Sequence, residues 1–184
     1  MKMLLVILTV SSSILFSQNN SLFIPKDIQK AIDYETRSNN GEPGKNYWQN
    51  KSEYKIDAEV FTDSSILVGE ETIKYYNNSP DTLDRIVIRL YQDIAKPGAT
   101  RDRYVSSKYL GEGLIINRII VDNDTLDISN ESRDIISGST NMIVTLEQPL
   151  APNKISSINV KWQFKIPKIW KIRMGNYGEG NFFI

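Results

Sequence analysis

The clearest signal along the chain is an alternation of apolar and polar residues that begins at Tyr54. Every second residue from Tyr54 to Val60 is apolar and the residues between them are charged, which predicts a strand with one dry and one wet face. A polar turn separates this segment from a second alternating run, 66–77, and we expect these two strands to form a hairpin. A third run follows at 83–91, so the pattern predicts an antiparallel meander of three consecutive strands.

Four further segments carry a strand pattern in the second half of the chain: 114–121, 126–128, 141–146 and 158–166. The last is the most regular, with apolar positions Ile158, Val160, Trp162, Phe164 and Ile166. Their shared face must contact another sheet or a neighbouring domain. About seven strands separated by turn clusters predict an all-β fold, either an antiparallel β-sandwich or a saddle-shaped sheet.

Two features precede the first strand. Residues 1–17 have the pattern of a secretory signal peptide, because Lys2 comes before an apolar stretch shorter than the roughly 20 residues needed to span a bilayer. We therefore expect a secreted or periplasmic protein without a permanent membrane span. The segment 18–50 is predicted to hold one short helix, since Ile28 and Ile32 recur at helical spacing. The remainder, 51–184, is the predicted β domain.

The segment 92–113 lacks any periodicity and mixes basic residues with tyrosine, proline and glycine. A loop of this length inside a compact domain is uncommon unless it has a task. Two interpretations stand side by side: a contact with a partner domain or the rim of a cleft, and a solvated excursion over the sheet.

The composition excludes several chemistries. The chain of 184 residues contains no cysteine and no histidine, so it can form neither a disulfide framework nor a Cys/His zinc site, a thiol nucleophile or a Ser-His-Asp triad. Its 22 basic and 22 acidic residues are interspersed, which argues against a nucleic-acid partner. We expect no catalytic residue, no metal ligand and no cofactor-binding residue in this chain.

Four aromatic residues are candidate platforms for a carbohydrate or protein ligand: Tyr47, Trp48, Trp162 and Trp170. For Tyr47 and Trp48 the plainer interpretation is that they cover one edge of the core. The alternation places Trp162 on the dry face of its strand, which weakens its candidacy.

Two pairs of carboxylates are candidates for acid–base chemistry, Glu70 with Glu71 and Asp122 with Asp124. Neighbours on a strand point to opposite faces, so Glu70 and Glu71 are not expected to converge on one bond. Asp122 and Asp124 occupy a predicted turn, where aspartate usually bonds the backbone. A calcium site there would lack the glycine and distal glutamate of an EF-hand loop.

Several runs, taken in order, resemble the N-terminal β domain of the aminopeptidase N (M1) family of zinc metallopeptidases, in particular its secreted bacterial branch. They lie between Ile24 and the end of the chain, and are 24–31 (IPKDIQKA), 44–50 (GKNYWQN), 69–73 (GEETI), 75–83 (YYNNSPDTL), 89–93 (RLYQD), 173–175 (RMG) and 182–184 (FFI). The ordered series is more specific than any single run.

The resemblance implies a non-catalytic domain that packs against a catalytic domain, in cis or in trans, and borders its cleft. In that family the zinc ligands and the catalytic glutamate lie downstream of the matching region, so we expect this sequence to be truncated before them. The interface is expected on the strand face 158–166 or on the aromatic tail 170–184. The alternative is a free-standing secreted β-sandwich that binds carbohydrate or protein.

Overall fold

The structure, a computed structural model, describes residues 23–102, 104–129, 135–168 and 174–183. The predicted signal peptide (1–17) and Trp170 lie outside the described residues. The chain divides into two compact units, Met1–Tyr47 and Trp48–Ile184. Within the part of the chain that the structure describes, no helix has the length and apolar character needed to cross a membrane.

The first unit contains the short helix that the sequence predicts, α1 (Lys26–Asp33). Asp27 lies in its first turn, where the helix dipole favours a negative charge. Beyond the helix, the backbone N–H groups of Thr36 and Arg37 both donate to the carbonyl of Ala31. Arg37 then forms a bridge with Pro43, which closes a small loop at the end of this unit.

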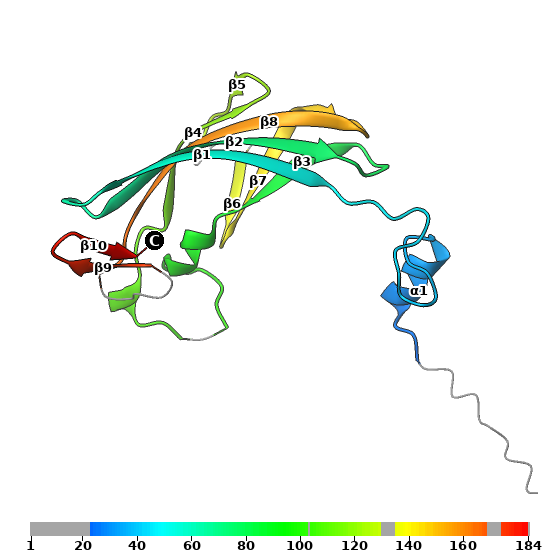
Figure 1. Ribbon diagram of the computed structural model, residues 1–184, viewed down its shortest axis with the longest axis horizontal. Coiled ribbons are helices and arrows are strands. Elements are labelled where there is room, and N and C mark those ends of the chain that lie inside the picture. The colour runs from blue at the N-terminus through cyan, green and yellow to red at the C-terminus, as the bar shows by residue number, and fades with distance from the viewer. Residues whose placement is uncertain (1–22, 103, 130–134, 169–173, 184) are drawn as a thin grey trace, which may run out of the picture. The chain divides into compact units, whose positions relative to one another are not determined.

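The second unit is built on a five-stranded antiparallel sheet with the strand order β1-β2-β8-β4-β5 (Figure 1). Its strands are β1 (Lys51–Phe61), β2 (Ile66–Asn77), β4 (Leu114–Val121), β5 (Asp124–Thr125) and β8 (Lys154–Lys165). The long strand β8 lies in the centre, between β2 and β4, and β1 forms an open edge.

A smaller antiparallel sheet has the strand order β3-β7-β6. Its strands are β3 (Leu83–Arg89), β6 (Ile135–Gly138) and β7 (Asn141–Leu150). A hairpin of β9 (Gly175–Gly178) and β10 (Asn181–Phe183) completes the strands, and two 3-10 turns, η1 (Tyr91–Ala95) and η2 (Ser107–Tyr109), lie in the long loop. The described residues thus form ten strands, and the three beyond the predicted set are three or four residues long.

The hydrophobic core lies between the larger and the smaller sheet. Ile119 of β4 and Ile158 and Val160 of β8 belong to one buried cluster with Met142 and Val144 of β7. These residues occupy alternate positions of their strands, so each strand presents one apolar face to the other sheet. The all-β, antiparallel, sandwich-like prediction is therefore confirmed.

The predicted meander of three strands is wrong. β1 and β2 form the expected hairpin, but β3 pairs with β7 in the other sheet, and β2 has β8 as its second neighbour. The redirection occurs at Asn77, whose buried side chain donates to the carbonyls of Asp81 and Leu150. Because those bonds tie the end of β2 to the end of β7, the chain leaves the larger sheet at this point.

Two strand boundaries also differ from the prediction. β7 runs through Pro149 to Leu150, and the proline lies where the pairing with β3 shifts register, so its missing N–H breaks no regular ladder. The short strand expected at 126–128 lies at Asp124–Thr125. It follows a two-residue turn in which Asp122 and Asn123 both have positive φ, the geometry that suits a tight hairpin.

Candidate functional site

The adjacent carboxylates Glu70 and Glu71 lie on opposite faces of β2. Glu70 is on the outer face, where its oxygens lie 3.0 Å from Nη2 of Arg118 and 3.2 Å from Nζ of Lys161. Hydrogen bonds from Asn159 and Lys161, together with the two nearby positive charges, hold the pKa of Glu70 below its ordinary value. The two carboxylates therefore do not form a catalytic pair.

Glu71 lies on the inner face, which is the face of the larger sheet that carries the core. It is paired with Ile56 on β1 and with Val160 on β8, so both lateral neighbours are apolar. Among the described residues, no hydrogen bond or ion pair engages its half-buried carboxylate. Burial raises the pKa of Glu71 above its ordinary value, because the charged form loses water without gaining a partner.

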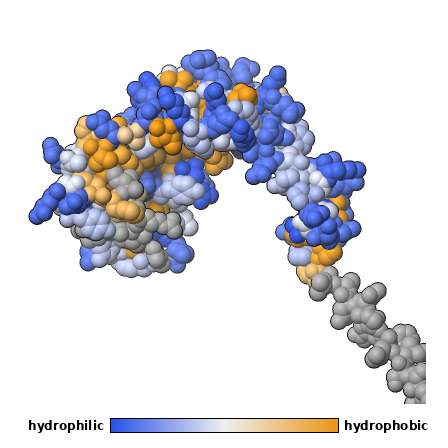
Figure 2. Space-filling model, in the orientation of Figure 1, coloured by the Kyte–Doolittle hydropathy of each residue, from blue (hydrophilic) through white to orange (hydrophobic). Residues whose placement is uncertain are grey.

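The inner face beside Glu71 is left uncovered along β1. We call this area the open margin and define it as Tyr54, Ile56 and Ala58 of β1 together with Glu71 of β2. Tyr54 is 60% exposed and Ile56 is 54% exposed, although both occupy the positions of a dry strand face. In the space-filling view, apolar patches interrupt the hydrophilic surface of the second unit (Figure 2).

The cause of the exposure is the position of the smaller sheet. Its strands bury residues of β2, β4 and β8, whereas β1 contributes nothing to that core cluster. Only Val60, at the far end of β1, packs against a second cluster, formed by Leu67, Phe164 and Ile166. The sequence prediction of a dry face on β1 is therefore wrong from Tyr54 to Ala58, where no described element of the second unit covers the strand.

Asp122 and Asp124 do not make a catalytic pair either. The carboxylate of Asp122 accepts 2.9 Å and 2.7 Å hydrogen bonds from the hydroxyl of Ser156 and the backbone N–H of Ser157. These bonds fasten the turn after β4 to the start of β8, which is the backbone-bonding task expected of a turn aspartate. In the described part of the chain, no group of three or more His, Cys, Asp or Glu residues is arranged to hold a metal ion.

The candidate aromatic platforms fall into different environments. Trp162 packs against both core clusters, its indole lies over Gly69, and its ring stacks on Phe164 with centroids 6.0 Å apart. Trp162 is thus a core residue, as its alternation predicts. Tyr47 and Trp48 are 53% and 42% exposed, so the interpretation that they cover a core edge is wrong.

The loop 92–113 is fastened at its base by a buried aspartate. The carboxylate of Asp93 accepts a 2.7 Å hydrogen bond from the backbone N–H of Leu114 and lies 3.3 Å from Nζ of Lys96. Gly113, with φ of 73°, allows this approach, because a Cβ there would lie 2.5 Å from Oδ1 of Asp93. Sequence reasoning missed Asp93, since nothing in the aperiodic segment distinguishes it from a solvated aspartate.

The interface expected on 158–166 is corrected by the structure. Ile158, Val160, Phe164 and Ile166 are buried, because β8 is the central strand and its apolar face lies inside the sandwich. In the aromatic tail, Phe182 packs against the cluster around Leu67, while Phe183 remains exposed. The exposed inner face therefore lies on β1 and not on the segment 158–166 of β8.

Comparison with known proteins gives distant structural neighbours. No family model and no curated protein matches the chain. Among solved structures, a mutant M1 zinc metallopeptidase from Deinococcus radiodurans has 13% identity over 74% of this chain, with a TM-score of 0.45. A mutant of the M1 zinc metallopeptidase from Deinococcus radiodurans with a bound Tyr-Ser-Ala substrate has 13% identity over 68%, with a TM-score of 0.43. A two-domain M1 zinc metallopeptidase mutant bound to L-arginine has 15% identity over 75%, with a TM-score of 0.44.

This chain spans about a quarter of the length of those proteins, between 23% and 26%. Likenesses this weak carry no argument about what the chain does.

Proposed function

We propose that this chain is a non-catalytic N-terminal β domain of a secreted zinc metallo-aminopeptidase of the M1 type. In this proposal it packs against a catalytic domain that the sequence does not contain and borders the cleft of that domain. The ordered series of sequence runs from Ile24 onward supports the family. The pattern of residues 1–17 supports export to the periplasm or the exterior.

The open margin is the observation that carries the proposal. A half-buried carboxylate between apolar neighbours is unfavourable when it has no partner, and exposed tyrosine and isoleucine on one strand face add an apolar surface. A second domain would relieve both conditions if it covered Tyr54 and Ile56 with apolar groups and brought a lysine or arginine to Glu71. The contact would then lower the pKa of Glu71, because an opposite charge nearby favours the ionised form.

Catalysis itself is assigned to the absent domain. Hydrolytic zinc sites use His, Cys and carboxylate ligands, and this chain has no His or Cys and no described acidic cluster that suits the ion. The residues present therefore do not fit a zinc site. This chain contributes a buried interface with the catalytic domain and forms one boundary of the substrate cleft.

The DNA that follows codon 184 tests the proposal. We expect an open reading frame that continues the chain and encodes a helix with the H-E-x-x-H spacing and a later glutamate, because that spacing places both histidines on one helix face. A stop codon with no such frame nearby would overturn the proposal and favour the free-standing binding module. For that alternative, Tyr47 and Trp48 are the exposed candidate platforms among the described residues, and Trp170 stays a prediction.

A further inference from the structure

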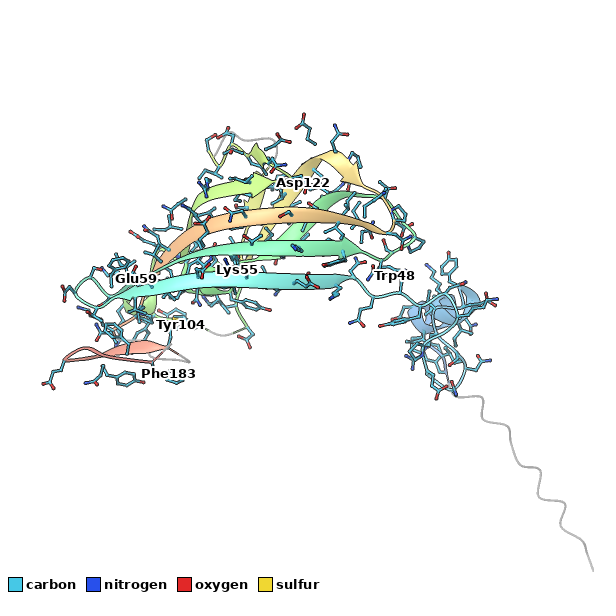
Figure 3. All side chains as sticks on the ribbon, turned by 45° about the horizontal axis from the view of Figure 1, so that its top comes forward. Trp48, Lys55, Glu59, Tyr104, Asp122 and Phe183 are labelled. Atoms are coloured by element: carbon cyan, nitrogen blue, oxygen red, sulfur yellow. The ribbon has the colours of Figure 1, made fainter. Side chains whose placement is uncertain are left out.

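The edge strand β1 offers a second surface, distinct from the face that carries the open margin. β1 is 11 residues long and pairs only with β2, so the backbone along its other side has no described partner. In Figure 3 it runs along the front of the sheet, with Lys55 and Glu59 labelled on it. A long, exposed edge is a ready template for pairing with another strand.

The register shows which residues of β1 direct their backbone groups outward. The N–H of Ile166 donates to the carbonyl of Ser65, and the regular register of β2 with β8 continues from this pair. In an antiparallel ladder the hydrogen-bonded pairs alternate, so the backbone groups of odd-numbered β2 residues bond to β8 and those of even-numbered residues bond to β1. Through the regular pairing of β1 with β2, the odd-numbered residues of β1 are then engaged. The N–H and C=O groups of Ser52, Tyr54, Ile56 and Ala58 therefore face the open side.

Several devices that usually protect an edge are missing from β1. The strand has no proline, its pairing with β2 has no bulge, and its inner face carries no charge. The charged residues all lie on the outer face, where Lys51 pairs with Glu53 and Lys55 with Asp57 along the strand. Surface pairs of this kind contribute little and exchange partners readily.

These charges are self-complementary in one antiparallel register. If Tyr54 lies opposite Tyr54 of a second copy, Lys51 faces Asp57 and Glu53 faces Lys55, and twofold symmetry repeats both pairs. No like charges meet in this register. Shifting the centre to Ile56 would place Glu53 opposite Glu59 twice, and centring on Lys55 would oppose that lysine to itself. Like charges directly opposite each other destabilise a sheet.

We propose that two copies of this chain associate through β1, antiparallel and centred on Tyr54, to form one continuous sheet. Tyr54 becomes a hydrogen-bonded pair with its symmetry mate, since its backbone groups face the open edge. The charged residues then fall on the non-hydrogen-bonded pairs, where side chains approach most closely. The inference is independent of the proposed aminopeptidase role, because it uses the edge of β1 and not the face of the sheet.

Light scattering on the full chain over a concentration series tests the association. We expect the mass to rise from one chain to two. Lys55→Glu should raise the protein concentration at which half of the chains are dimeric by at least tenfold. The variant places a glutamate opposite Glu53 of the second copy, and the twofold symmetry repeats this repulsive pair. The Lys55 side chain is 82% exposed, so an unchanged circular dichroism spectrum is the control for folding. A protein that stays monomeric at high concentration would overturn the inference.

The charge-swapped variant Glu53→Lys/Lys55→Glu tests the charge pairing, and the single variant Glu53→Lys separates the registers. The double variant restores opposite charges in the register centred on Tyr54, so the dimer should return. In the register centred on Ile56 the double variant only exchanges the attractive and the repulsive pair, so it does not discriminate there. Glu53→Lys alone opposes Lys55 in the register centred on Tyr54 and should weaken the dimer, whereas in the register centred on Ile56 it would face Glu59 and strengthen the dimer. Failure of the swap to restore association, or a dimer that ignores Lys55→Glu, would contradict the proposed pairing.

Disulfide trapping provides a direct geometric readout, because the chain has no native cysteine. Across a hydrogen-bonded pair the Cα atoms lie about 5.5 Å apart, within the range that a disulfide bridges. Tyr54→Cys should therefore crosslink on mild oxidation. In the register centred on Tyr54, the two copies of position 56 are offset by about 13 Å along the strands. Ile56→Cys should therefore not crosslink. Crosslinking of Ile56→Cys in preference to Tyr54→Cys would overturn the register.

Discussion

One half of the inner face of the larger sheet is buried and the other half is exposed. Val160 of β8 and Ile56 of β1 lie on either side of Glu71 in the same row of the ladder. Val160 is 1% exposed and Ile56 is 54% exposed. The smaller sheet covers the half that contains β8 and β4 and leaves the half that contains β1.

The difference shows what strand alternation can and cannot tell. Both strands present apolar residues on one face, yet burial depends on whether a second layer lies above that face. On β8 the layer is part of this chain. On β1 no described element of the second unit supplies it, so the same pattern produces an exposed apolar face in place of a core.

The largest expected effect contrasts two isoleucines of this face. Ile158→Ala should lower the free energy of unfolding by about 2–5 kcal/mol, because Ile158 is 1% exposed and its removal leaves a cavity. Ile56→Ala should change it by less than about 0.5 kcal/mol, as for an exposed site. Urea unfolding of both variants measures the contrast. Equal losses would mean that β1 is covered in solution.

An intermediate effect is expected at the border of the two halves. Gly69 lies beneath Trp162, and a Cβ there would lie 2.3 Å from the indole. Gly69→Val should therefore cost about 1–3 kcal/mol through forced repacking of Trp162. Ala58 pairs with Gly69 on the open side, so Ala58→Val is the matched control and should be near neutral. Tryptophan fluorescence should shift in the first variant and not in the second.

The smallest expected effect is on how the stability of the protein depends on pH. Glu71 and Glu70, on the two faces of β2, should contribute to this dependence with opposite signs. Burial raises the pKa of Glu71, so its unfavourable contribution is absent below its unfolded pKa, near 4.5, and develops as pH rises through the folded value. Glu71→Gln should raise the urea midpoint at pH 7 by the equivalent of less than about 1 kcal/mol, since the group is half exposed. At pH 4 the two proteins should agree.

Glu70→Gln is the control for that experiment. Hydrogen bonding to Asn159 and Lys161 lowers the pKa of Glu70, so its favourable contribution is present above its unfolded pKa and is lost as pH falls. The variant should therefore lower the midpoint at pH 7 and not at strongly acidic pH. If both variants moved the midpoint in the same direction, the assignment of the two carboxylates to different environments would be wrong.

The sequence predicted the local elements better than their partners. The hairpin of β1 and β2, the strand β8 and the helix α1 follow from periodicity and turn residues, which act over a few positions. The departure of β3 to the other sheet depends on the bonds of Asn77 to Asp81 and Leu150, and the latter is far along the chain. No local pattern encodes such a contact.

The candidate site was predictable in part. The placement of Glu71 on the dry alternation of β2 follows from its position in the sequence, and so does its separation from Glu70. The exposure of Tyr54 and Ile56 does not follow, because it depends on the extent of the smaller sheet. The anchoring role of Asp93 was also hidden, since its partner Leu114 lies at the other end of an aperiodic loop.

The central claim is that this chain assists a catalytic site built elsewhere. Metal content and aminopeptidase activity of the purified protein, measured together after incubation with zinc, test it most directly. We expect no stoichiometric zinc and no cleavage above background, because the chain has neither imidazole nor thiol to hold the ion. Tightly bound zinc at one equivalent, accompanied by peptide hydrolysis, would contradict it.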